Sequence, residues 1–360
     1  MPLDAENLFK TSLQQAIFAC ATSLDALKAS RTQAPEIPEN KPSPADVRSD
    51  FISILTLLYA RSTSLTLVLN AGPDSYSAAR EPLADISRDV TRLAHCAGLF
   101  SVVGPTIRSE AIWATEEVVG SIQTYLLSFT RSKATQATPE DSKSSLMLRV
   151  GTIHSTIDQI KSSFSVDNRA AIAKRWRSDA SHLDDAMREV KEIIEEAESN
   201  DPGSLEDDFD DGWGEITNSR AGKLAEHEVE TAKKVMLILR MVALLHKRIL
   251  LRIITPWPGT KADGTELERL LSLSSELAAR IDDMAASLWS PQDPQQIAAR
   301  AAAVQKRADA LRESLISSGS LPSGQPIEPG TDSHVDSKDV EWFQMCFSQI
   351  DKAVSNISNV

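Results

Sequence analysis

Residues 234–254, "KVMLILRMVALLHKRILLRII", form the most apolar run in the chain and decide its fold class. A bilayer would penalise the cations within this run, whereas a helix inside a protein bundle tolerates them on one face. The run therefore predicts a central bundle helix over about 219–254 rather than a membrane span. The interrupting side chains are Arg240, His246, Lys247, Arg248 and Arg252.

The rest of the chain is also predicted to be helical. Apolar residues recur every three or four positions, and Ser43-Pro44 and Asp293-Pro294 are typical helix starts. No alternating β-branched run of convincing length occurs. The pattern therefore predicts an all-α protein of about ten long helices, at 4–30, 43–72, 74–102, 106–130, 139–165, 168–199, 219–254, 263–289, 293–318 and 339–357.

Long helices joined by short breaks predict two antiparallel up-and-down bundles, and packing of the vinculin or catenin kind is a looser alternative. The Pro- and Ser-containing break at 131–140 is where we expect the domain boundary. The predicted domains are an N-terminal bundle at 1–135 and a C-terminal bundle at 136–360. An acidic linker at 200–218 interrupts the second.

Composition and charge limit the classes of partner. The net charge of −13 argues against direct binding to nucleic acid or to anionic membranes, which needs clustered Lys and Arg. Three widely separated cysteines indicate a reducing compartment, and the first residues lack the pattern of a secretory signal. We therefore expect a cytoplasmic or nuclear protein with protein partners.

No motif points to catalysis, a cofactor or a metal. A calcium loop centred on Gly212 would place Phe209 and Asn218 at ligand positions, where Phe cannot ligate and the bidentate Glu is missing. The expectation is therefore a non-enzyme with no catalytic residues, cofactor or metal site. An enzyme or carrier with a site assembled in a bundle core remains an alternative, and buried charged residues around His154, His182 or His246 would favour it.

The stretch "SLEDDFDDGWGEIT", residues 204–217, is the candidate partner-binding segment. A purely solvated tether is the simplest interpretation of its acidic residues. Phe209 and Trp213 argue against that interpretation, because they would expose apolar area without benefit and would share one face of a helical turn. The segment then docks either on its own bundle or on a partner. The tentative partner-binding residues are Asp207, Asp208, Phe209, Asp210, Asp211 and Trp213.

Several of these features together resemble the cyclin-D-binding, or cyclin-D-interacting, protein family. They are the acidic linker with "DDGW", the long helix with "LILRMVALLHKRIL", the Pro-rich break after it, and the closing "DVEWFQMCFSQIDKAVSNI". The resemblance covers about the C-terminal 160 residues, and the N-terminal half only by length and helix pattern. The matching residues near the end are Trp342, Phe343, Cys346, Ile350 and Asp351.

The resemblance implies a helical regulator without catalysis. Members of that family bind cell-cycle proteins such as D-type cyclins, and helix–loop–helix transcription factors. A cell-cycle or transcription-linked role through cyclin or helix–loop–helix partners is therefore the first functional expectation. A cytoskeletal or adhesion scaffold of the vinculin or catenin kind is the alternative.

Overall fold

Helices account for nearly all of the chain that the structure describes. The computed structural model describes residues 2–32, 42–72, 75–131, 139–199, 224–255, 264–322 and 337–358. Within those ranges it contains ten α-helices and no strand, with a 3-10 turn, η2 (Phe100–Val102), and a π-helical turn, η3 (Leu250–Ile254). The predicted all-α class is confirmed.

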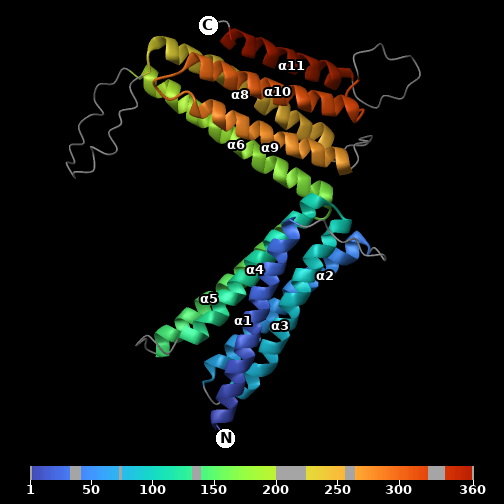
Figure 1. Ribbon diagram of the computed structural model, residues 1–360, viewed down its shortest axis with the longest axis vertical. Helices are drawn as coiled ribbons and strands as arrows, with labels where there is room; N and C mark the ends of the chain where they lie inside the picture. Colours follow the sequence, from blue (N-terminus) through green and yellow to red (C-terminus); the bar gives the residue numbers. More distant parts are fainter. Residues whose placement is uncertain are drawn as a thin grey trace, which may run out of the picture. The chain divides into compact units, whose positions relative to one another are not determined.

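The first compact unit, Met1–Ala171, is a bundle of five helices (Figure 1). In it α3 packs against three neighbours, and α5 packs against α2 and α4. Two contacts show that α2 and α5 run antiparallel. The Lys161 ammonium donates to Thr56 Oγ1 at 2.9 Å, and His154, earlier in α5, lies against Thr63, later in α2. The helices are α1 (Pro2–Thr32), α2 (Pro44–Asn70), α3 (Tyr76–Leu99), α4 (Pro105–Arg131) and α5 (Pro139–Ser163).

By length and composition, α2 is the one described helix that could cross a membrane. A core helix of a bundle passes the same test, and α2 supplies core residues throughout its length. Phe51, Leu58 and Leu65 are fully buried, and Phe51 packs against Phe100 and Phe164 with ring centroids 5.5 and 4.9 Å apart. Packing in the first unit therefore accounts for the buried apolar residues of α2, whereas Leu57 and Leu67 are exposed.

The second compact unit, Ile172–Val360, is also a bundle of five helices (Figure 1). Here α8 and α11 pack antiparallel. Cys346 Sγ lies 3.6 Å from the Met241 carbonyl oxygen, and Arg248, further along α8, pairs with Asp339, which comes earlier in α11. The helices are α6 (Asn168–Glu198), α8 (Glu226–Ile249), α9 (Gly264–Ala286), α10 (Pro294–Ser317) and α11 (Ser337–Ser358).

Side-chain caps fix several helix starts where the sequence predicts them. Ser43 accepts a hydrogen bond from the Asp46 amide at 3.1 Å, with Pro44 in the first turn of α2. Asp293 accepts from the Gln295 amide at 2.9 Å at the start of α10. Such caps satisfy amides that have no partner within the helix, so each boundary is set locally.

The division between the units falls at Ala171 and Ile172, not at the break near 135 that the sequence analysis favours. The physical reason is the packing of α5. Its residues Ile153, Ile157 and Ile160 are buried in the core of the first unit, so α5 belongs to that unit. The break at 131–140 is thus a connection within one bundle.

Candidate functional site

The predicted partner-binding residues lie outside the described part of the chain. Asp207, Asp208, Phe209, Asp210, Asp211 and Trp213 all fall between Ser199, after the end of α6, and Leu224, before the start of α8. Their role therefore stays a prediction.

The start of α8 is tied to the connection between α9 and α10 through one carboxylate. Glu228 accepts hydrogen bonds from the Ala225 amide at 2.8 Å and from the Gln292 amide at 2.7 Å. These two backbone hydrogen bonds favour the charged form and lower the pKa of Glu228, the bond from Gln292 contributing most. The acidic segment is thus followed by a firmly capped helix.

A buried polar cluster lies inside the second unit, where α6, α8 and α9 meet. His246 Nε2 is 2.8 Å from Ser274 Oγ, and Ser274 Oγ donates to Asp179 Oδ2 at 2.8 Å. Ser275 donates to the same carboxylate oxygen at 2.9 Å. Trp176 stacks on the His246 ring with centroids 4.3 Å apart, and its Nε1 donates to the His246 carbonyl at 3.1 Å. Five side chains from three helices are thereby held together.

The order of hydrogen bonds in this cluster does not suit nucleophilic catalysis. In a catalytic triad the histidine lies between the serine and the carboxylate and removes the serine proton. Here the Ser274 hydroxyl donates directly to Asp179, so His246 donates to Ser274 as a neutral imidazole. Burial lowers the pKa of His246 to about 3, which makes it a weak base at neutral pH.

The buried cluster is therefore best explained as a polar link within the bundle. Its one carboxylate, Asp179, is 2% exposed and is satisfied by two hydroxyl donors, with Arg175 Nε 3.9 Å from Oδ1. Buried polar groups that are fully hydrogen-bonded rigidify and specify a core. Although buried polar residues surround His246, their arrangement does not favour the enzyme alternative.

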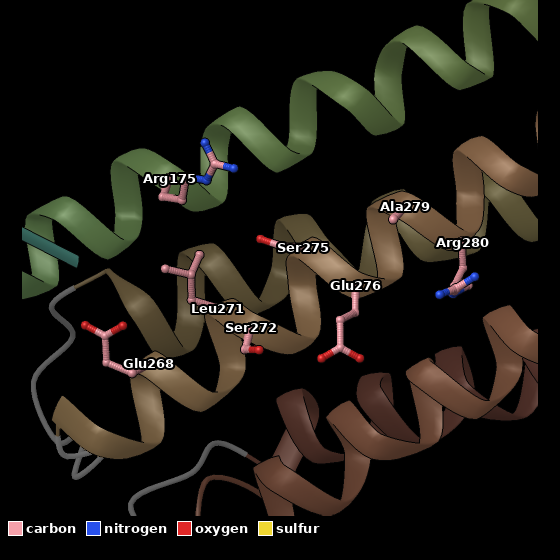
Figure 2. A pocket seen from close by; sticks show the side chains of 8 residues that line it. All are labelled: Arg175, Glu268, Leu271, Ser272, Ser275, Glu276, Ala279 and Arg280. Carbon is pink, nitrogen blue, oxygen red and sulfur yellow. The ribbon is translucent and has the colours of Figure 1, made fainter. Parts of the chain in front are cut away.

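An open groove beside this cluster is lined by Arg175 of α6 and by residues around α9. Figure 2 shows Arg175 on α6, with Leu271 and Ser275 on the side of α9 toward it and Glu276 on the opposite side. The charged side chains here already have partners: Glu276 pairs with Arg307 at 2.9 Å. The remaining lining residues are Glu268, Ser272, Ala279 and Arg280.

The other histidines singled out in the sequence form no comparable cluster. His154 stacks on Tyr59 with ring centroids 3.7 Å apart and lies 2.9 Å from Thr63 Oγ1, so it packs within the first unit. Its pKa is lowered chiefly by burial. His182 is exposed on α6. In the part of the chain that the structure describes, no three His, Cys, Asp or Glu side chains converge in a way that could hold a metal ion.

The cluster was not predicted from the sequence, although its polar members interrupt apolar series that the sequence shows. On α6, Asp179 interrupts the apolar series that contains Trp176 and Leu183, and Ser274 interrupts the corresponding series on α9. A polar residue at a core position of an amphipathic helix predicts a buried partner. Spacing along one helix does not show which other helix supplies it.

The C-terminal residues that carry the family resemblance are mainly packing residues. Phe343, Cys346 and Ile350 are buried in the core of the second unit. Trp342 lies beneath Arg248, whose Cζ is 5.2 Å from the ring centroid, and Asp351 accepts from Gln305 Nε2 at 2.8 Å. They attach α11 to α8 and α10.

Two family models match the chain in order and together cover most of it. Residues 50–196 match "Grap2 and cyclin-D-interacting, N-terminal", and residues 209–313 match "Grap2 and cyclin-D-interacting, C-terminal". The first match extends over the half where the resemblance rested only on length and helix pattern, and the second ends before α11. Comparison with curated proteins found no match. The suspected relationship is confirmed: the chain belongs to the Grap2 and cyclin-D-interacting family.

Proposed function

We propose that the protein is a non-enzymatic regulator that binds a cyclin or helix–loop–helix partner and so acts in cell-cycle or transcriptional control. The ordered match to both family models carries this proposal, because the family is named for its interactions with Grap2 and cyclin D. The hydrogen-bond order around His246 and the paired charges of the groove in Figure 2 support a role without catalysis.

The proposed binding segment includes Phe209 and Trp213. The acidic residues around them would provide charge, and the two aromatic side chains would provide the anchors that contribute most to affinity in protein interfaces. In this mechanism the segment engages an apolar and basic surface of the partner and occludes it.

We expect Phe209→Ala/Trp213→Ala to weaken binding of a purified D-type cyclin at least about tenfold, since each aromatic anchor contributes on the order of 1–2 kcal/mol or more. Biolayer interferometry with the immobilised full chain measures this change, with purified Grap2 as a second analyte. Trp113→Ala, at an exposed position of α4, is the matched control and should bind like wild type. Wild-type protein that binds neither analyte would contradict the proposed function.

The same variant distinguishes a partner site from an internal contact. One outcome is that wild type and Phe209→Ala/Trp213→Ala bind the partner equally while limited proteolysis within 200–218 is faster in the variant. In that case the aromatic residues hold the segment against the protein itself. The proposed regulator would then bind through one of its bundles, and the six predicted segment residues would lose their assignment as a partner site.

Two consecutive helical bundles also support a second candidate, a scaffold of the vinculin or catenin kind. That function requires actin or adhesion partners, so cosedimentation of the full chain with actin filaments tests it. We place the protein in the cytoplasm or nucleus, a proposal supported by three free, buried cysteines. Imaging of the tagged chain tests this location.

A further inference from the structure

One outward face of α8 alternates leucine and basic residues. Leu237, Arg240, Leu244, Lys247 and Leu251, called here the α8 stripe, follow one another at spacings of three and four, and Leu251 lies in the continuing turn η3. The three leucines are 46%, 49% and 52% exposed, and both basic side chains are exposed. The opposite faces of the helix already supply the core of the second unit.

This spacing distinguishes the stripe from scattered surface leucines. Single exposed apolar residues are normal on protein surfaces, whereas paired helices meet along two positions of each heptad, three and four residues apart. In the stripe a leucine takes one of these positions and a cation takes the other. At 1.5 Å per residue, the stripe from Leu237 to Leu251 is about 21 Å long, which matches two heptads of a neighbouring helix. The α8 stripe is therefore the right size and shape for one further helix.

Among the described residues, the charges of the stripe lack carboxylate partners, unlike the other basic residues of α8. Lys233 pairs with Glu198 at 2.5 Å, and Arg248 pairs with Asp339. By contrast, Arg240 and Lys247 have no carboxylate partner among the residues that the structure describes. Two cations therefore stand between three half-exposed leucines on a protein whose net charge is −13.

We propose that the α8 stripe is a docking surface for an amphipathic helix of a partner protein, with apolar and acidic side chains alternating at the same spacing. This inference rests on the proposed function and adds a second contact surface to the acidic aromatic segment. A second copy of the chain fits poorly, because two stripes brought together would place Arg240 and Lys247 of one copy against the same cations of the other.

A designed peptide tests the stripe in the full-length protein. The probe is a fluorescein-labelled peptide of three heptads, with leucine at each a position, glutamate at each d position, and alanine or glutamine elsewhere. A second peptide carries lysine in place of glutamate. Fluorescence anisotropy at ~0.15 M salt, where screening is physiological, should show binding of the glutamate peptide to wild type and weaker binding of the lysine peptide.

Two sets of substitutions locate the binding. Leu237→Ser/Leu244→Ser/Leu251→Ser should weaken binding of the glutamate peptide at least about 30-fold. The matched control changes three leucines exposed elsewhere, Leu8, Leu67 and Leu148, to serine and should leave binding unchanged. Circular dichroism checks that each variant keeps its helix content.

Charge reversal gives a readout that a folding defect would not produce. Arg240→Glu/Lys247→Glu should lose the glutamate peptide and gain the lysine peptide. Its control is Lys306→Glu/Lys352→Glu, which makes the same charge change at exposed positions of α10 and α11. An unchanged peptide preference in the stripe variant would overturn the proposal.

Five further outcomes would also overturn it. Equal binding of the glutamate peptide to all variants would place the binding site elsewhere. No binding of that peptide to wild type would mean that the stripe is not a docking surface. If the peptide binds only after Asp207, Asp208, Asp210 and Asp211 are changed to asparagine, the chain's own acidic segment occupies the stripe. A dimer, seen by light scattering and lost in the leucine variant, would make a second copy the occupant. If a stripe variant captures cyclin as strongly as wild type does, the stripe is not the docking surface, although the proposed function still holds.

Discussion

Replacing Trp176 with alanine is expected to lower the free energy of unfolding of the second unit by about 3–5 kcal/mol. The side chain is fully buried, so its removal leaves a large cavity where α6 meets α8 and α9. The substitution also removes the ring stacked on His246 and the donor to the His246 carbonyl. Urea unfolding followed by circular dichroism measures the loss.

Two variants separate packing from hydrogen bonding at this position. Trp176→Phe keeps an aromatic ring against His246 but loses the indole N–H, so it should cost about 1–2 kcal/mol. Trp289→Ala removes a half-exposed tryptophan of the same unit, with its hydrogen bond to Glu189, and should cost about 1–2 kcal/mol, less than Trp176→Ala. A loss for Trp176→Ala no larger than that for Trp289→Ala would show that the cluster does not stabilise the bundle.

Hydrogen exchange shows where Trp176→Ala acts. Amides of α8 and α9 should lose protection first, because both helices contact the cluster around Trp176. Amides of α2 and α3 lie in the other compact unit and should change less. Equal loss in both units would mean that they unfold together.

The helices could be predicted because their signals are local. The apolar spacing and the caps at Ser43 and Asp293 lie within one or two turns of each boundary that they set. The beginning of α8 is set differently: the helix starts at Glu226, later than the predicted 219, and Glu228 anchors it through Gln292, 64 residues away in sequence. A contact across that separation leaves no pattern near residue 226.

The domain boundary and the polar cluster depend on which helix faces meet. A break of Pro and Ser residues at 131–140 has the composition of an interdomain linker, but the burial of Ile157 places α5 with the first unit. In the same way, Asp179, His246 and Ser274 each interrupt an apolar series on a different helix, and only packing brings them within 2.8 Å. The exposed α8 stripe was also not recognisable from composition, because α8 is apolar over most of its circumference.

Acid is expected to destabilise the second unit through His246. Burial lowers its pKa in the folded protein from 6.5 to about 3, so the unfolded chain takes up a proton at a higher pH than the folded chain does. A group of this kind stabilises the fold fully above the unfolded pKa and loses that contribution as pH falls toward the folded pKa. Between pH 7 and pH 4.5 the loss is about 2–3 kcal/mol, at 1.36 kcal/mol per pH unit below 6.5.

Carboxylates also titrate in this range, so the contribution of His246 has to be measured as a difference between variants. His246→Gln keeps a donor toward Ser274 Oγ but does not titrate. The variant should therefore start less stable at pH 7 yet lose about 2–3 kcal/mol less than wild type on going to pH 4.5. His227→Gln, at an exposed position of the same helix, is the matched control and should follow wild type. Parallel pH profiles for wild type and His246→Gln would mean that the pKa of His246 is the same in the folded and unfolded protein, which contradicts its burial as a neutral donor to the Ser274–Asp179 pair.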